Sequence, residues 1–359
     1  MVSLSKMASL HSVSYPVPQV AALQPLRLPD WNRQEWTRRA SQLHYPDYHD
    51  LAAWMEFREA AVTLAEQYLP LTIRQALAEF FAPAGDAAVV LENLPLDSEL
   101  PEIPLDGARP ASKQSVSEAI ITGILCQWGE VLSYKNEKLG SPIHEVTPIP
   151  GMEGAQSNGG RVQFGFHSDN AFLPVWFRQR GILLYGLCNQ GGTATTVVTA
   201  EQLLDAAMPD LAVSLAKHIY RHACPASFSL PGGMASSTTG GKTLSAPCPI
   251  LWRDEIGVAR VNAASSSIEP MNNEAATALQ RFRALLEWLE PARVVVAPGT
   301  ALLFKDDRVL HGRDAVKGPR WLQRAYFTDS LELLREVTGS DARAFSFDAK
   351  SLLSPRHRL

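Results

Sequence analysis

The sequence has few cysteines, no long apolar run and little net charge. None of its four cysteines stands in the CxxC spacing of thiolate zinc sites. No apolar stretch approaches the roughly 18 residues that a membrane helix needs, and residues 1–19 are too interrupted by polar residues and prolines for a secretory signal. The net charge of −4 is too small to indicate a nucleic-acid or membrane partner. We therefore expect a soluble, cytoplasmic protein with reduced, mostly buried thiols.

The first third of the chain favours helices. Apolar residues recur at spacings of three and four through residues 47–82, with a break near Pro70, and again through 114–133. Between these helices we expect a short strand at 87–96 and a proline-rich loop at 97–113.

After residue 140 the pattern changes to short apolar runs separated by Gly, Pro and Asn. Such runs predict strands, and two helical stretches, 200–219 and 273–290, interrupt them. Residues 231–248 are small and polar with four glycines, which suits either a lid loop over a site or an inert insertion. Helices followed by many strands predict a mainly β fold, a barrel or jelly roll with flanking helices.

The stretch FGFHSDNAF places His167 and Asp169 one residue apart among aromatic residues. In a strand, residues two apart point to the same face, so the imidazole and the carboxylate would project together. The pair can supply two ligands to a metal, or it can be an ordinary structural contact.

A second histidine, His311, follows an apolar run in the segment VLHGRD. Two histidines and one carboxylate form the facial triad typical of non-haem Fe(II) oxygenases, which leaves three coordination positions open. Zinc hydrolysis at the same three residues is the alternative enzyme chemistry.

Two arginines, Arg320 and Arg324, lie in the segment RWLQRAYF, which is predicted to be an inward-facing strand. A buried guanidinium is costly unless it meets an anion, and its fork fits a carboxylate. A dicarboxylic cosubstrate could place its far carboxylate there, whereas a zinc hydrolase has no clear use for this pair.

Together the segments HSD (167–169), GGTATTVVTA (191–200), PGTALLFKDDRVLHGR (298–313) and RWLQR (320–324) resemble a known family. They are similar to the Fe(II)/2-oxoglutarate-dependent oxygenases of the clavaminate synthase and taurine dioxygenase superfamily. The layout around SNGGRVQFGFHSDNAF is similar to that of the arginine and asparagine hydroxylases of antibiotic pathways. The resemblance spans roughly residues 85–330.

The resemblance implies a double-stranded β-helix (jelly-roll, cupin-like) core and a set of site residues. Iron would be held by His167, Asp169 and His311. Arg324 would bind 2-oxoglutarate, with Arg320 as a supporting arginine and a threonine hydroxyl nearby. For that threonine we favour Thr195 over its neighbours Thr193 and Thr196.

Substrate contacts are inferred from the same resemblance and from its departures. Ser157 falls near a substrate-contacting loop of the amino-acid hydroxylases. The segment 257–270 lacks the acidic pair of the arginine-type enzymes and offers Arg260 and Asn262 instead, so a polar or acidic substrate side chain is favoured over a cationic one. Asp169 stands where those hydroxylases usually have Glu, and it argues against halogenation, because halogenases have a small residue there.

The sequence thus predicts an Fe(II)/2-oxoglutarate-dependent dioxygenase that uses O2 as cosubstrate. It would hydroxylate an amino acid or an amino-acid derivative, free or carrier-bound, with desaturation, epoxidation or a non-catalytic jelly-roll binding protein as alternatives. We divide the chain into an N-terminal extension (1–45), a single oxygenase domain (46–335) and a C-terminal tail (336–359).

Overall fold

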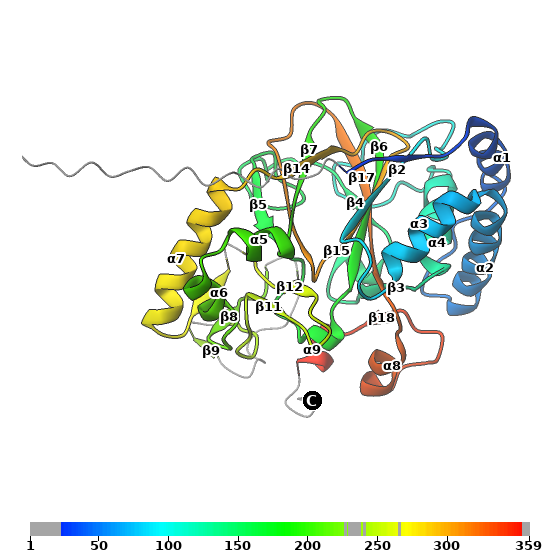
Figure 1. Cartoon of the computed structure of the whole chain (residues 1–359). Helices are drawn as coiled ribbons and strands as arrows, with labels where there is room; N and C mark the ends of the chain where they lie inside the picture. Colours follow the sequence, from blue (N-terminus) through cyan, green and yellow to red (C-terminus); the bar gives the residue numbers. More distant parts are fainter. Residues whose placement is uncertain (1–22, 226–227, 229–237, 240–241, 265–266, 354–359) are drawn as a thin grey trace, which may run out of the picture.

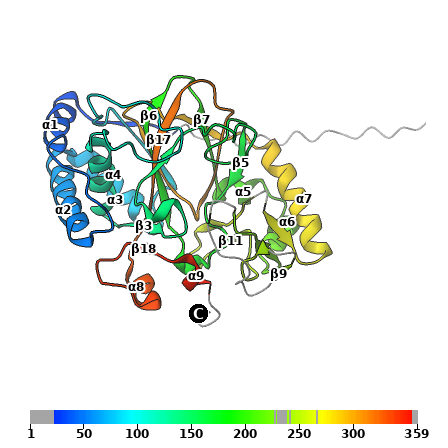
Figure 2. The same cartoon turned by 180° about the vertical axis from the view of Figure 1, so that it is seen from behind.

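A computed structural model describes residues 23–225, 228, 238–239, 242–264 and 267–353 of the chain. Strands of two sheets fill the centre, and helices flank them on opposite sides (Figures 1 and 2). The predicted combination of a β centre with flanking helices is therefore observed. Within the described residues, no helix combines the length and the apolarity that crossing a membrane requires.

The larger sheet is built mostly from antiparallel strands around β6 and β17, which pair along nearly their whole length. Only the edge pairs β1–β2 and β18–β3 are parallel. In sheet order its strands are β1 (Leu26–Arg27), β2 (Ala88–Glu92), β15 (Ala301–Lys305), β6 (Gly181–Asn189), β17 (Arg320–Thr328), β3 (Glu130–Tyr134) and β18 (Ser346–Phe347), and β4 (His144–Val146) also pairs with β17.

The smaller sheet is antiparallel and carries the two histidines of interest. Its strands, in order, are β14 (Ala292–Val295), β7 (Ala194–Thr199), β16 (Val309–Arg313) and β5 (Phe164–His167). Three further two-stranded ribbons pair β8 (Tyr220–His222) with β13 (Ile268–Pro270), β9 (Thr238–Thr239) with β10 (Lys242–Thr243), and β11 (Leu251–Arg253) with β12 (Ala259–Val261).

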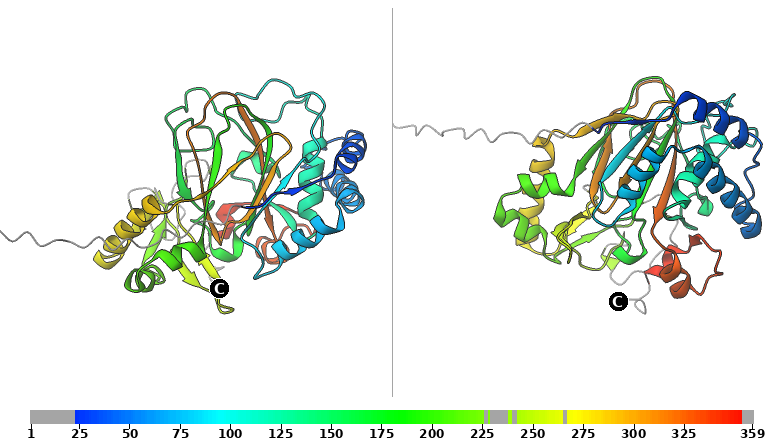
Figure 3. Two further views of the ribbon diagram at one scale, coloured as in Figure 1. Left: turned by 45° about the horizontal axis from the view of Figure 1, so that its top comes forward. Right: turned by 45° about the vertical axis from the view of Figure 1, so that its right-hand side comes forward.

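Two groups of helices cover the sheets, as the tilted views of Figure 3 also show. The first group, on the side of the larger sheet, is α1 (Asp30–Ala40), α2 (Leu51–Tyr68), α3 (Leu71–Phe81) and α4 (Val116–Cys126). The second group is α5 (Ala200–Ala206), α6 (Pro209–Leu215) and α7 (Asn273–Trp288). The remaining elements are α8 (Glu332–Thr338), α9 (Ala349–Leu352) and the 3₁₀ turns η1 (Lys138–Gly140) and η2 (Val175–Phe177).

Each helix group shares a core with the sheets. The larger core includes Trp54, Phe80 and Phe327, and the smaller one includes Leu215 and Phe282. Burial of one such side chain stabilises the fold by about 1.5–3 kcal/mol. Helices α2 and α4 approach closely at Gly123, where an added Cβ would lie 2.4 Å from the Ala61 carbonyl oxygen.

The helix predictions are correct in place and wrong in extent. The stretch 47–82 forms α2 and α3, with Pro70 as the N-cap of α3. The helix predicted over 114–133 ends at Cys126, because Glu130–Tyr134 pairs with β17 instead. The stretch 200–219 is two helices, because Pro209, which lacks a backbone N–H, starts α6.

The regions predicted as extension and lid are described only in part. The described part of the N-terminal extension provides β1 and α1, while residues 1–22 lie outside the described residues. Of the predicted lid, 231–237 and 240–241 also lie outside them. The domain boundaries and the lid stay predictions. The four cysteines are free and of intermediate exposure, and burial raises the pKa of Cys126, Cys224 and Cys248, in agreement with the expectation of reduced, mostly buried thiols.

Candidate metal centre

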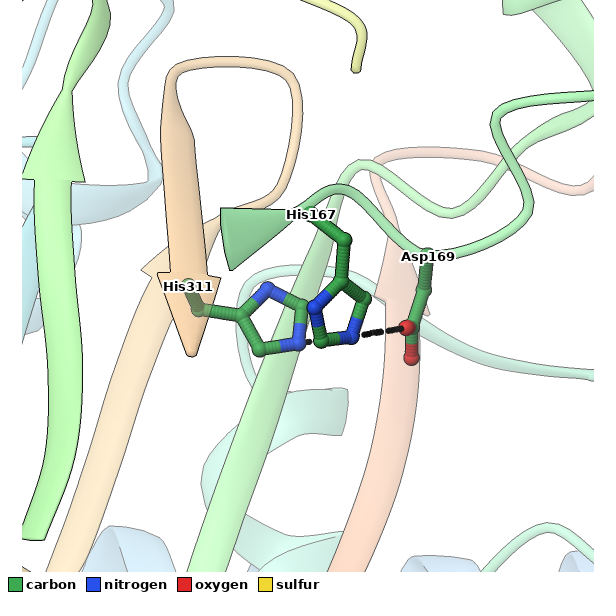
Figure 4. A group of neighbouring side chains, drawn as sticks. All are labelled: His167, Asp169 and His311. Atoms are coloured by element: carbon green, nitrogen blue, oxygen red, sulfur yellow. Dashed lines mark ion pairs between the residues drawn. The ribbon is translucent and has the colours of Figure 1, made fainter. Parts of the chain in front are cut away.

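Two histidines from neighbouring strands and one carboxylate from the turn that follows converge at the smaller sheet (Figure 4). His167 and His311 lie directly opposite each other in the pairing of β5 with β16, and their ring centroids are 4.2 Å apart. Asp169 Oδ1 lies 3.3 Å from His167 Nε2 and 3.8 Å from His311 Nε2. One ligand atom from each residue lies within 4.8 Å of the others, a group suited to one cation.

The sequence pattern predicted that Asp169 lies in the same strand as His167, and the structure differs. Strand β5 ends at His167, so Asp169 follows the strand instead of belonging to it. The next residue, Asn170, has a positive φ of 54° and begins the turn that leads the chain away. The convergence therefore depends on this turn and on the contacts that hold the carboxylate.

On each imidazole, the ring nitrogen that faces away from the centre lies near an oxygen, but only that of His167 makes a hydrogen bond among the described residues. His167 Nδ1 donates to the Gly165 carbonyl oxygen at 2.9 Å, which leaves Nε2 with its lone pair toward Asp169. His311 Nδ1 lies 3.4 Å from Asp306 Oδ1, and Gln179 donates to the other Asp306 oxygen at 2.7 Å. Burial lowers the pKa of His311 to about 4, so this ring is neutral, as a metal ligand must be.

Asp169 is held by its outer oxygen. Arg324 Nη1 donates to Asp169 Oδ2 at 2.6 Å, and the Tyr326 hydroxyl donates to the same oxygen at 2.9 Å. Burial opposes ionisation of Asp169, but the Arg324 charge and the His167 contact outweigh it and hold the pKa below its ordinary value. The inner oxygen, Oδ1, stays directed at the two histidines.

Arg324 makes further contacts around this carboxylate with Nη2, while its Nε has no hydrogen-bond partner among the described residues. Its Nη2 donates to Glu137 Oε1 at 2.6 Å and to His144 Nδ1 at 2.8 Å. Burial, followed by the Arg324 charge, lowers the pKa of His144 and so favours the neutral ring that can accept this bond. The sequence pattern around the histidine–aspartate pair did not predict Glu137, His144 or Tyr326 as site residues. Tyr326 could have been found, because it lies two residues beyond Arg324 on the same face of β17.

Arg320 has a different environment. It is 3% exposed, and its Nε and Nη1 have no hydrogen-bond partner among the described residues. Burial and the nearby charge of Arg313 lower the pKa of Arg320 to about 9, as expected of a buried cation without an anion. Because side chains alternate along β17, Arg320 and Arg324 project from the same face.

The predicted threonine, Thr195, lies on β7 directly opposite Arg313 of β16. Thr195 is 3% exposed, and residues directly opposite in an antiparallel pair share a face of the sheet. Val197, two residues along β7, belongs to the larger core and lies opposite His311. Thr195 therefore lies on the same face of the smaller sheet as His311.

A cavity of about 610 Å³ opens beside the three converging side chains. Its lining includes His167, Asp169, Arg324, Tyr326 and Glu137. The predicted substrate residue Ser157 also lines it, and its buried hydroxyl has no partner within the described part of the chain.

The other two predicted substrate residues are not in this lining. Arg260 forms ion pairs with Asp254, at 2.7 Å, and with Asp307. Asn262 lines a different cavity, where it contacts Arg178. Strand β12, which contains Arg260, and Asn262 just after it therefore place both residues outside the lining of the first cavity.

Comparison with known proteins gives one curated relative and many similar structures. The chain is 28% identical over 304 residues to L-asparagine oxygenase of Streptomyces coelicolor, a match that covers 81% of this chain and 85% of the relative. Asparagine oxygenase in complex with Fe(II), 2S,3S-3-hydroxyasparagine and succinate superposes with a TM-score of 0.77 at 25% identity, over 90% of this chain and 98% of that one. These matches support an Fe(II)/2-oxoglutarate-dependent oxygenase of the clavaminate synthase-like superfamily.

A more distant member shares the fold. The non-haem iron oxygenase OrfP, in complex with (3S)-hydroxy-L-Arg, has a TM-score of 0.73 at 17% identity, over 90% of this chain and 99% of that chain. No family model matches the sequence. These neighbours bind iron together with succinate or alpha-ketoglutaric acid, and the group of His167, Asp169 and His311 could hold a metal ion in this chain.

Proposed function

We propose that this oxygenase hydroxylates an unactivated C–H bond of an amino acid, free or carrier-bound, in the cytoplasm. The reaction is coupled to decarboxylation of 2-oxoglutarate to succinate. The observation that carries the proposal is the buried Arg324–Glu137 pair in the wall of the 610 Å³ cavity, next to Asp169. A guanidinium and a carboxylate at one place complement the α-carboxylate and α-ammonium groups of an amino acid.

Iron fits the three converging side chains. His167 Nε2, His311 Nε2 and Asp169 Oδ1 would hold it, because both imidazoles present Nε2 and the outer oxygen of Asp169 is already bonded. A bound Fe(II) supplies the activation of O2 that side chains alone cannot provide. The chain's own part is to fix the three ligands on one side and to leave the cavity side open.

The cosubstrate fits the face that carries Arg320 and Thr195. Arg320 has two unpartnered buried nitrogens, so a carboxylate at this point would satisfy a donor that the described protein leaves unsatisfied. Arg324 instead lines the cavity beside Asp169 and Glu137, on the side proposed for the amino acid. We therefore assign the far carboxylate of 2-oxoglutarate to Arg320, with the Thr195 hydroxyl beside it, and place Arg324 at the amino acid.

The strand arrangement agrees with the fold expected of the family. We propose that the smaller sheet and the facing strands of the larger one form a double-stranded β-helix, within one oxygenase domain over residues 46–335. Residues 231–248 would close over the cavity and keep water from the bound substrates.

The test is an anaerobic titration with Fe(II) and 2-oxoglutarate, followed by a screen of amino acids for accelerated succinate release. We expect stoichiometric iron, and succinate release that rises at least tenfold with one amino acid. Hydroxylated product distinguishes hydroxylation from desaturation or epoxidation by its mass. Succinate release that no free or carrier-bound amino acid stimulates would exclude the proposed substrate class.

A further inference from the structure

A second cavity, of about 790 Å³, lies behind the wall of the first. Ala171 and Phe172 line both cavities, and they lie two and three residues after Asp169 in the chain. Much of the lining of the second cavity is apolar and includes Trp176 and Trp252.

A buried cation lines this cavity. Arg178 is 7% exposed, and its Nε has no hydrogen-bond partner among the described residues. No ion pair within 4.0 Å joins Arg178 to a carboxylate in the part of the chain that the structure describes. Its Nη1 instead donates to the amide oxygen of Asn262, a neutral group.

The surroundings of Arg178 contain a second unsatisfied polar side chain. His222 is fully buried, and neither of its ring nitrogens has a partner in the described structure. Its backbone N–H donates to Ser245 Oγ at 2.9 Å, and Ser245 lines the same cavity. Burial, together with the Arg178 charge, lowers the pKa of His222 to about 3, so the ring is neutral. A buried cation without a carboxylate and a buried imidazole without a hydrogen-bond partner are costly unless a further polar group satisfies them.

We propose that the second cavity is a binding site for the carboxylate of an organic acid, with Arg178 as the anchor and Asn262 as the residue that positions it. The apolar side chains of the lining, including Trp176 and Trp252, accommodate the hydrocarbon body of the ligand, and the Arg178 guanidinium binds its carboxylate. The carboxylate has two conceivable sources, a free organic acid or the side chain of an acidic amino-acid substrate. That the carboxylate belongs to an amino-acid substrate rests on the function proposed above. The presence of a carboxylate-binding site at Arg178 does not depend on that function.

Asn262 supports a connection with the active-site cavity. Its side-chain amide donates to the Ala171 carbonyl oxygen at 3.4 Å while its oxygen accepts from Arg178. A ligand at Arg178 is thus one side chain away from the wall that the two cavities share.

The binding test compares hexanoate with its neutral isostere hexanamide, followed through the fluorescence of Trp176 and Trp252. We expect hexanoate to bind the wild type about 10- to 100-fold more tightly than hexanamide, as a charge-assisted contact predicts. Arg178→Gln removes this preference and Arg178→Lys retains part of it. Arg253→Gln is the matched control, because Arg253 lines the same cavity but is exposed and paired with Glu201.

A second variant covers the case in which Arg178→Gln does not fold. Asn262→Asp keeps the shape of the side chain and gives Arg178 a permanent carboxylate, so it should abolish hexanoate binding. Equal binding of hexanoate and hexanamide, absence of binding, or unchanged preference in Asn262→Asp would overturn the proposal.

Turnover separates the two sources. If the carboxylate belongs to the substrate, L-glutamate stimulates succinate release more than L-glutamine, hexanoate competes with it, and Arg178→Gln lowers kcat/KM for glutamate at least tenfold more than for glutamine. Hexanoate that binds without competing identifies a free organic acid. If no amino acid stimulates succinate release while hexanoate binding still depends on Arg178, the proposed function fails and the carboxylate site stands.

Discussion

The Arg324 guanidinium lies 2.6 Å from Asp169 Oδ2, and this contact joins the larger sheet to the turn that follows the smaller one. The two residues are 155 positions apart in the sequence. Arg324 also contacts Glu137 and lines the cavity, so one arginine both orients the Asp169 carboxylate and forms part of the cavity wall. Orientation of the proposed iron ligand and the proposed recognition of the substrate are therefore coupled through a single side chain.

The first prediction concerns the histidines. His167→Ala and His311→Ala should each abolish tight Fe(II) binding and turnover, because each removes one of three ligands. His167 lines the cavity, and both side chains are about one-tenth exposed, so the fold should survive. Anaerobic Fe(II) titration and succinate release check this, with the exposed His49→Ala as control. Succinate release at the wild-type rate in either variant would refute the ligand role.

The second prediction distinguishes the two arginines of β17. Arg320→Ala should raise the KM for 2-oxoglutarate about 10- to 100-fold, because it removes a charge-assisted contact. Arg324→Ala should act mainly on the KM for the amino acid and on iron affinity, whereas the sequence alone assigned 2-oxoglutarate to Arg324. Initial rates with each substrate varied in turn decide between them. An effect on the 2-oxoglutarate KM from Arg324→Ala alone would restore the sequence-based assignment.

The third prediction tests Tyr326 as a positioning residue. Tyr326→Phe removes the hydroxyl that donates to Asp169 Oδ2 and should weaken Fe(II) binding about tenfold, at the lower end of effects on groups that support metal ligands. The KM for 2-oxoglutarate should stay unchanged. Tyr134→Phe, which loses a hydroxyl bonded to the Phe177 carbonyl, serves as the control. Equal iron affinities of the wild type and Tyr326→Phe would show that the hydroxyl does not position Asp169.

The fourth prediction is a pH dependence of stability. Burial and the Arg178 charge lower the pKa of His222 from 6.5 to about 3. The unfolded chain gains a proton near pH 6.5 that the folded chain does not take up. His222 therefore lowers the free energy of unfolding as the pH falls from about 6.5 toward 3, by up to about 1.4 kcal/mol per pH unit.

His222→Leu should remove this contribution, so the stability of the wild type relative to the variant should fall as the pH falls, by up to about 1.4 kcal/mol per pH unit. The comparison isolates His222 from Glu145, whose pKa burial raises to about 7 and whose contribution runs in the opposite direction. Urea unfolding between pH 6.5 and 4.5 measures the difference. Parallel curves for the two proteins would contradict the prediction.

The fifth prediction concerns a buried charge network beneath the larger sheet. Lys113 Nζ lies 2.9 Å from Asp97 and 2.8 Å from Glu118, with no side chain of the three exposed. Lys113→Met leaves two buried carboxylates with one cation fewer and should destabilise the fold by about 3–5 kcal/mol.

Lys217→Met is the matched control for Lys113→Met. Lys217 forms an exposed pair with Glu274, so its removal should cost under about 1 kcal/mol. Urea unfolding at neutral pH compares the two variants. Similar losses of stability would show that burial of the Lys113 network does not determine its contribution.

The local pattern of the sequence predicted much of this protein. Alternation along a strand and the period of a helix depend on neighbouring residues, so the β centre, the flanking helices and the histidine–aspartate pair could be inferred from spacing. The positions at which helices and strands end were less predictable. The segment Glu130–Tyr134 continues an apolar pattern that suits a helix, but pairing with β17 makes it a strand.

Which ion-pair and hydrogen-bond partners the polar side chains have was decided only by the tertiary structure. The sequence placed two arginines four residues apart on one strand, but packing of the two sheets gives Asp169 and Glu137 to Arg324 and leaves Arg320 without a partner among the described residues. It likewise pairs Arg260 with two aspartates and turns Asn262 toward Arg178. A short segment fixes which side chains share a face, because backbone geometry is local. Which distant group meets each of them depends on how the sheets are brought together, and no local spacing encodes that.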